Sequence, residues 1–145
     1  MNRIRPKALL ATTLVLGLVW LGNRLEPTVD AGPGDFETDL QAAFDEGRSG
    51  VWVEGHATLV RHLADDHDGS RHQRFVVRLG SGQTLLLSHN IDIASRLTDT
   101  RAGDRISFRG RYEWNEMGGV VHWTHRDPQG RLEGGWIEAA GKRVR

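Results

Sequence analysis

The chain has 145 residues with 19 basic and 19 acidic side chains, so its formal charge is zero and its isoelectric point lies near 7.1. It contains no cysteine, which excludes disulfide frameworks, cysteine-ligated zinc and thiol catalysis. A neutral isoelectric point also argues against a dedicated nucleic-acid-binding protein. This length fits one small domain with an appendage, and such a domain forms a core without disulfides or metals.

Residues 1–25 have the composition of a bacterial export signal. The segment carries four basic side chains and no acid, and residues 8–22 are an uncharged, mostly apolar run. That run is shorter than the roughly 20 apolar residues that cross a bilayer, and only a weak cleavage site follows it. We therefore expect a periplasmic or otherwise exported protein. Residues 8–22 are then either removed or kept as an inner-membrane anchor, which makes the membrane a partner.

A linker and a short helix are expected next, over residues 26–49. Two prolines and two glycines between residues 26 and 34 indicate the linker. Phe36, Leu40 and Phe44 form an apolar stripe at helical spacing, and Asp35 and Gly47 suit the two ends of a helix. This amphipathic helix is expected to pack on the domain or to face the membrane.

From residue 50 onward the apolar period changes to two, which is typical of strands. Strands are predicted over residues 51–60, 72–79, 83–88, 104–114 and 120–125. The connections are predicted as a polar turn over 64–70, a short helical turn over 91–97 and a last small hairpin within 135–144.

The predicted order is three strands, a helical turn and two further strands, and Gly55 allows the first strand to bend. This is the order of elements in an OB-fold. The expected fold class is therefore mainly β: a small OB-like five-stranded barrel over residues 50–128 with an N-terminal helix and a signal or anchor segment. Residues 129–145 are assigned to a C-terminal hairpin. An SH3-like barrel is the alternative, which the predicted helical turn disfavours.

Polar side chains gather where the second, third and fifth predicted strands begin or end. We expect the following residues to line a ligand site: Arg71, His72, Arg74, His89, Asn90, His122, His125 and Asp127. Guanidinium groups bind phosphate or carboxylate in a forked geometry, while histidine and asparagine side chains would orient the ligand. The sequence therefore predicts a site for a small or oligomeric anionic ligand, and it assigns no catalytic residue.

A metal site is not predicted, and no cofactor is expected. His122 and His125 are an odd number of residues apart, so they cannot share one face of a regular strand. The acidic loop over residues 65–69 lacks the acid twelve positions on that a calcium loop requires. If Trp52 or Trp123 is exposed, it would fit a stacking platform for single-stranded nucleic acid. Tyr112, Trp114 and Trp123 also fit core positions.

Four strings carry a resemblance to known sequences: GSRHQRF (69–75), SGQTLLLSHNID (81–92), YEWN (112–115) and HWTHRDP (122–128). They resemble an uncharacterised family of bacterial exported proteins that is described as a domain of unknown function. The resemblance covers residues 40–145 and implies a small exported protein, with no activity attached.

Three functions are compatible with these observations. The first is an exported OB-like domain that binds an anionic small molecule or oligomer, with nucleic acid as a weaker candidate ligand. The second is a histidine-dependent hydrolase or nuclease, with or without a metal, because histidine serves as a base near neutral pH. The third is an envelope scaffold whose polar residues hold the barrel together.

Overall fold

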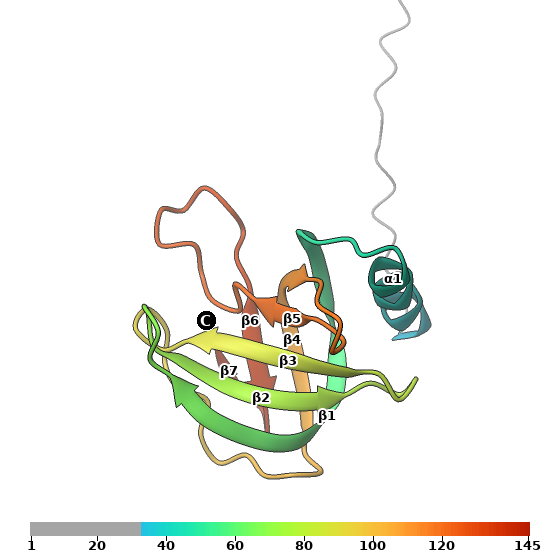
Figure 1. Cartoon of the computed structure of the whole chain (residues 1–145). Coiled ribbons are helices and arrows are strands. Elements are labelled where there is room, and N and C mark those ends of the chain that lie inside the picture. The colour runs from blue at the N-terminus through green and yellow to red at the C-terminus, as the bar shows by residue number, and fades with distance from the viewer. Residues whose placement is uncertain (1–32) are drawn as a thin grey trace, which may run out of the picture.

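The computed structural model describes residues 33–145, which form one helix followed by seven strands. The elements are α1 (Pro33–Asp45), β1 (Val51–Asp66), β2 (His72–Arg78), β3 (Thr84–Asn90), β4 (Arg105–Glu113), β5 (Val120–His122), β6 (Trp136–Ala139) and β7 (Lys142–Val144). The prediction of a mainly β fold with an N-terminal helix is confirmed (Figure 1). The predicted signal or anchor segment lies outside the described residues. Within residues 33–145, no helix has the length and apolar character needed to span a bilayer.

All seven strands belong to one sheet in the order β1-β2-β3-β5-β4-β6-β7, and β1 also pairs with β4. Five of the strands therefore form a closed ring of pairings, in which β5 lies parallel to β3 and antiparallel to β4. The long strand β1 closes the ring because its first half pairs with β4 and its second half with β2 (Figure 1). The C-terminal pair β6–β7 extends the same sheet from β4.

The ends of β1 and β5 differ most from the sequence prediction. β1 continues to Asp66, through part of the polar turn predicted over residues 64–70. Its register against β2 shifts at two places, and such bulges let a strand bend and continue with unpaired residues. β5 ends at His122 instead of residue 125, because Trp123 has a φ of 57° and turns the chain out of the sheet.

The connection between β3 and β4 contains no helix, so the helical turn predicted over residues 91–97 is wrong. A turn follows Asn90, where the Ile91 N–H donates to the Arg71 carbonyl (2.9 Å). Leu97 is then buried, and the Gln73 side chain of β2 binds both backbone groups of Leu97. A tertiary contact therefore fixes this segment where the sequence had suggested local helix formation.

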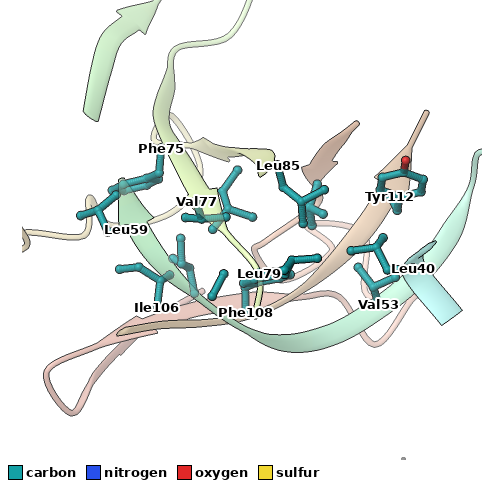
Figure 2. Packing of buried hydrophobic residues seen from close by; sticks show 14 of the residues in the cluster. Leu40, Val53, Leu59, Phe75, Val77, Leu79, Leu85, Ile106, Phe108 and Tyr112 are labelled. Atoms are coloured by element: carbon teal, nitrogen blue, oxygen red, sulfur yellow. The ribbon is translucent and has the colours of Figure 1, made fainter. Parts of the chain in front are cut away.

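The core fills the inside of the ring. The burial pattern alternates along β2, β3 and β4, as expected for strands with one face inward. Figure 2 shows side chains of this cluster, which include Leu40, Val53, Leu59, Phe75, Val77, Leu79, Leu85, Ile106, Phe108 and Tyr112. The inward direction predicted for Phe75, Val77 and Leu79 is confirmed.

Helix α1 packs on the domain, in agreement with the first of the two predicted locations. Phe36 and Leu40 are buried in the core, and the Glu37 carboxylate accepts N–H bonds from Gly80 and Ser81 in the β2–β3 connection (2.7 and 2.9 Å). Trp114 is 43% exposed, which rules out its predicted core position. Its indole Nε1 instead donates to the Phe44 carbonyl (3.0 Å), joining the end of β4 to the end of α1.

The docking of α1 depends on the missing side chain of Gly55. A Cβ at Gly55 would lie 2.3 Å from Cδ1 of Phe36, whose ring packs edge-on against Phe108. We expect Gly55→Ala to lower the free energy of unfolding by about 1–3 kcal/mol, as overpacking does, measured by urea denaturation. In a Phe36→Ala background the same change should cost much less. An equal cost in both backgrounds would contradict this account of helix docking.

Candidate functional site

A pocket of about 380 Å³ opens where β2, β3 and β5 meet the loop over residues 123–135. Its lining includes His72, Ser88, Asn90, His122, Trp123, His125, Asp127 and Arg131. Five of the eight residues predicted for the ligand site therefore lie around one pocket: His72, Asn90, His122, His125 and Asp127.

The strand pleat explains why His72, Ser88 and Asn90 face the pocket. His72 on β2 and Asn90 on β3 are cross-strand partners, and both are half-buried on the outward face of the sheet. Ser88 lies on the same face because it is two residues from Asn90. His122 comes from the adjacent end of β5, whereas His125 comes from the loop beyond it.

Each of the three pocket histidines has one ring nitrogen held by an oxygen. His72 Nδ1 lies 2.7 Å from the Ser70 carbonyl, and His125 Nδ1 lies 2.7 Å from the Arg126 carbonyl. His122 Nε2 lies 3.3 Å from Oε1 of Glu113. Since these oxygens accept hydrogen bonds, we assign the ring proton to these nitrogens. The other nitrogen of each ring carries a lone pair in the neutral form.

The geometry of these imidazoles does not amount to a metal centre. Among residues 33–145, no group of three or more histidine, aspartate or glutamate side chains is arranged to hold a metal ion. Each imidazole offers one acceptor when neutral and a second donor when protonated.

Trp123 and His125 form the aromatic side of the pocket. Their ring centroids are 5.4 Å apart with an interplanar angle of 31°. Trp123 is half-buried and lines the pocket, so its predicted core position is wrong. The Gly135 N–H donates to the His125 carbonyl (2.7 Å), which closes the base of the loop.

Asp127 organises the loop that forms one wall of the pocket. Its carboxylate accepts N–H bonds from Gln129, Arg131 and Leu132 at 3.0, 2.9 and 3.0 Å. The bond from Gln129, followed by those from Leu132 and Arg131, holds the pKa of Asp127 below its usual range. These hydrogen bonds to the loop backbone therefore explain why an acidic side chain lies in this pocket.

Arg71 and Arg74 lie outside the pocket lining. The Arg71 Nε pairs with Asp92 (2.8 Å), and the Arg74 Nε donates to the Ala64 carbonyl (2.9 Å). The cation in the lining is Arg131, which is not among the residues predicted from the sequence. The signal for Arg131 is its place directly after Asp-Pro-Gln-Gly (127–130), a string typical of a turn.

His89 is fully buried, under the loops that border the pocket. Its Nε2 donates to the Ser95 carbonyl (3.0 Å), and its Nδ1 accepts from the Thr124 hydroxyl (2.8 Å). Burial lowers the pKa of His89 below its ordinary value of 6.5, and the positive charges of protonated His125 and His72 would lower that pKa further. His89 therefore joins β3 to both neighbouring loops as a neutral imidazole.

The stability of the domain should depend on pH through His89. An unfolded chain binds a proton on His89 near pH 6.5, whereas the folded state resists that proton. The free energy of unfolding is therefore expected to fall as the pH drops below about 6.5. This fall should be smaller in His89→Gln, measured by urea denaturation between about pH 7 and pH 5.

A matched control is His67→Gln, because His67 is exposed in the connection between β1 and β2. This control should keep the pH dependence of the wild type. Aspartates with lowered pKa values, such as Asp127, affect stability in a lower pH range. Their contribution to the free energy of unfolding is lost only as the pH falls below 3.8. An unchanged slope in His89→Gln would contradict the assignment.

The structure thus defines a mainly β domain with a histidine-rich pocket at the junction of three strands and a loop. The chain belongs to the family described as Protein of unknown function (DUF3465), whose model matches residues 31–145. This match confirms the prediction of a family without an assigned function. No curated protein matches the sequence.

Proposed function

We propose that this protein is an exported binding domain for a small or oligomeric anionic ligand, held in the pocket beside β2, β3 and β5. The observation that carries the proposal is the convergence of three histidines with Asn90 and Arg131 around about 380 Å³. A pocket of this size suits a small ligand or one unit of an oligomer.

The hydrogen-bond donors around the pocket suit an anion. The oxygens of Asp127 are engaged by three backbone N–H groups, and Glu113 lies against His122. Arg131 contributes a guanidinium, and an imidazole that takes up a proton gains a second N–H. Both groups form charge-assisted hydrogen bonds with phosphate or carboxylate.

The proposal includes an OB-like barrel and export. The OB-like barrel is supported by the ring of pairings β1-β2-β3-β5-β4, and ligands of an OB-fold bind on the face of strands two and three. Export is supported by the basic start and the apolar run within residues 1–25. The domain would therefore work in the periplasm or beyond, with residues 8–22 as its anchor if they are retained.

Hydrolysis of a bound phosphoester is a second candidate function. It is favoured by His72 and His125, since the Nε2 of each carries a lone pair in the neutral ring and can act as a general base beside the pocket. Steady release of nitrophenol from bis(4-nitrophenyl) phosphate, lost in His125→Gln, would support this candidate over simple binding.

Calorimetric titration of the full chain with inorganic phosphate and with pyrophosphate tests the binding proposal. Arg131→Gln should weaken binding about tenfold or more, because charged hydrogen bonds contribute about 1.5–3 kcal/mol. The matched control is Arg101→Gln, since the Arg101 side chain is 91% exposed. An equal loss in the control, or no binding of either probe, would contradict the proposal and favour a scaffold.

A further inference from the structure

The outward face of the sheet has an apolar groove next to the polar pocket. Leu63 of β1, Val76 of β2 and Leu86 of β3 are half-buried there, and with Met117 they line about 270 Å³. Met117 is 81% exposed. Outward positions of an antiparallel sheet are usually polar, so a cluster of apolar side chains on this face indicates a binding surface.

The strand register places this groove directly beside the pocket. Val76 and Leu86 are cross-strand partners, and the outward pairs that follow are Arg74 with Ser88 and His72 with Asn90. Outward residues on one strand are about 6.6 Å apart. Leu86 and Asn90 are four residues apart on β3, so about 13 Å separates the Val76–Leu86 pair from the His72–Asn90 pair at the far end of the pocket.

Strand β5 shows the same change from apolar to polar. Val120 is the parallel partner of Leu86, and His122 follows two residues later on the same strand. Because β3 and β5 are parallel, both strands run from the groove toward the pocket. The sheet thus offers one continuous surface with an aliphatic end and a histidine-containing end.

The cations on this surface are spaced along it. Arg131 lines the pocket and Arg61 lines the groove. Arg74 lies at the boundary, where its Nε is fixed on the Ala64 carbonyl (2.9 Å). A chain attached to an anionic group in the pocket can therefore lie along this face between Arg131 and Arg61, where the register places Val76 and Leu86.

We propose that the ligand of this surface is an anionic amphiphile with a single aliphatic chain. The phosphate or carboxylate head occupies the pocket, and the chain lies in the groove of Leu63, Val76, Leu86 and Met117. This inference rests on the proposed function, because it specifies which kind of anion the pocket takes.

The composition of the groove favours an aliphatic chain over a polynucleotide. The apolar side chains of its lining are aliphatic and lie beside the polar side chains of Arg61, Thr84 and Asn115. Single-stranded nucleic acid is instead held by aromatic rings that stack on successive bases. The aromatic pair Trp123–His125 is confined to the pocket end. Met117 is unbranched and flexible, and such a side chain adapts to chains of differing length.

A series of n-alkyl phosphates tests the inference: ethyl, butyl, hexyl and octyl phosphate, each below its micellar concentration. Titration calorimetry with the full chain should show affinity rising by about fourfold for each added methylene until the groove is filled. Arg131→Gln should lower the affinity for every member by the same factor. The dependence on chain length should then remain.

A groove variant separates the head from the chain. Val76→Thr combined with Leu86→Thr places threonine, whose β-branched side chain suits a strand, at both positions and adds a hydroxyl group at each. It should reduce the gain in affinity per methylene and leave the affinity for ethyl phosphate unchanged. Leu132→Thr is the matched control, because Leu132 is exposed and does not line the groove. Melting curves of all variants establish that they are folded.

The outcomes distinguish the two proposals. If ethyl phosphate binds through Arg131 but affinity does not change with chain length, the amphiphile inference is wrong and the anion pocket stands. If neither the alkyl phosphates nor inorganic phosphate bind, both are wrong. Binding of oligothymidylate that the groove variant abolishes, without any gain from alkyl chains, would overturn the inference in favour of nucleic acid.

Discussion

Gly135→Ala is expected to lower the free energy of unfolding by at least about 3 kcal/mol, the upper end of the usual cost of overpacking. A Cβ at Gly135 would lie 2.2 Å from both the Arg109 and the Trp123 carbonyl oxygens. These atoms belong to the backbones of β4 and of the loop, so a side-chain rotation cannot relieve the contact. Urea denaturation followed by tryptophan fluorescence measures the change.

The same substitution should also abolish binding of phosphate. Gly135 holds the base of the 123–135 loop through its N–H bond to His125, and that loop supplies Trp123, His125 and Arg131 to the pocket. The control is Gly80→Ala, where a Cβ would meet the movable Glu37 carboxylate at 3.0 Å. Equal destabilisation by the two substitutions would contradict a specific role for the close approach at Gly135.

Gln73→Met is expected to lower the free energy of unfolding by at least about 2 kcal/mol. The buried Gln73 amide donates to the Leu97 carbonyl (2.8 Å) and accepts from the Leu97 N–H (3.0 Å). Methionine has a similar shape but replaces neither hydrogen bond. Each buried backbone group left without a partner costs about 1–3 kcal/mol.

Gln41→Met provides the comparison for Gln73→Met. Gln41 is on the surface of α1, where its side chain binds Asp45 one turn later (2.8 Å). Its replacement should change the free energy of unfolding by no more than about 0.5 kcal/mol. Hydrogen exchange should also show faster exchange of the Leu97 amide in Gln73→Met alone. Unchanged protection of that amide would contradict the anchoring role of Gln73.

The prediction of His89 as a ligand-site residue depends on a third strand that ends at residue 88. Leu85 and Leu87 alternate inward on β3, and the next inward position is His89. The pleat continues to Asn90, so His89 lies under the loops and hydrogen-bonds to Ser95 and Thr124.

The sequence by itself determined the mainly β class, the inward face of most strands and the stripe by which α1 docks. These features follow from local periodicity, since the alternation of apolar residues decides which side of a strand is buried. The pairing of His72 with Asn90 also needs the register across the β2–β3 connection, which local periodicity does not give.

Only the tertiary structure decided the composition of the pocket. The parallel pairing of β3 with β5 and the closure of β1 on β4 are contacts between distant segments, which local patterns do not encode. The positive φ of Trp123 then turns the chain away from β5, and Asp127 folds the loop so that Arg131 reaches the pocket. The pocket thus depends on backbone geometry and long-range hydrogen bonds, whereas the faces of its strands depend on hydrophobic burial.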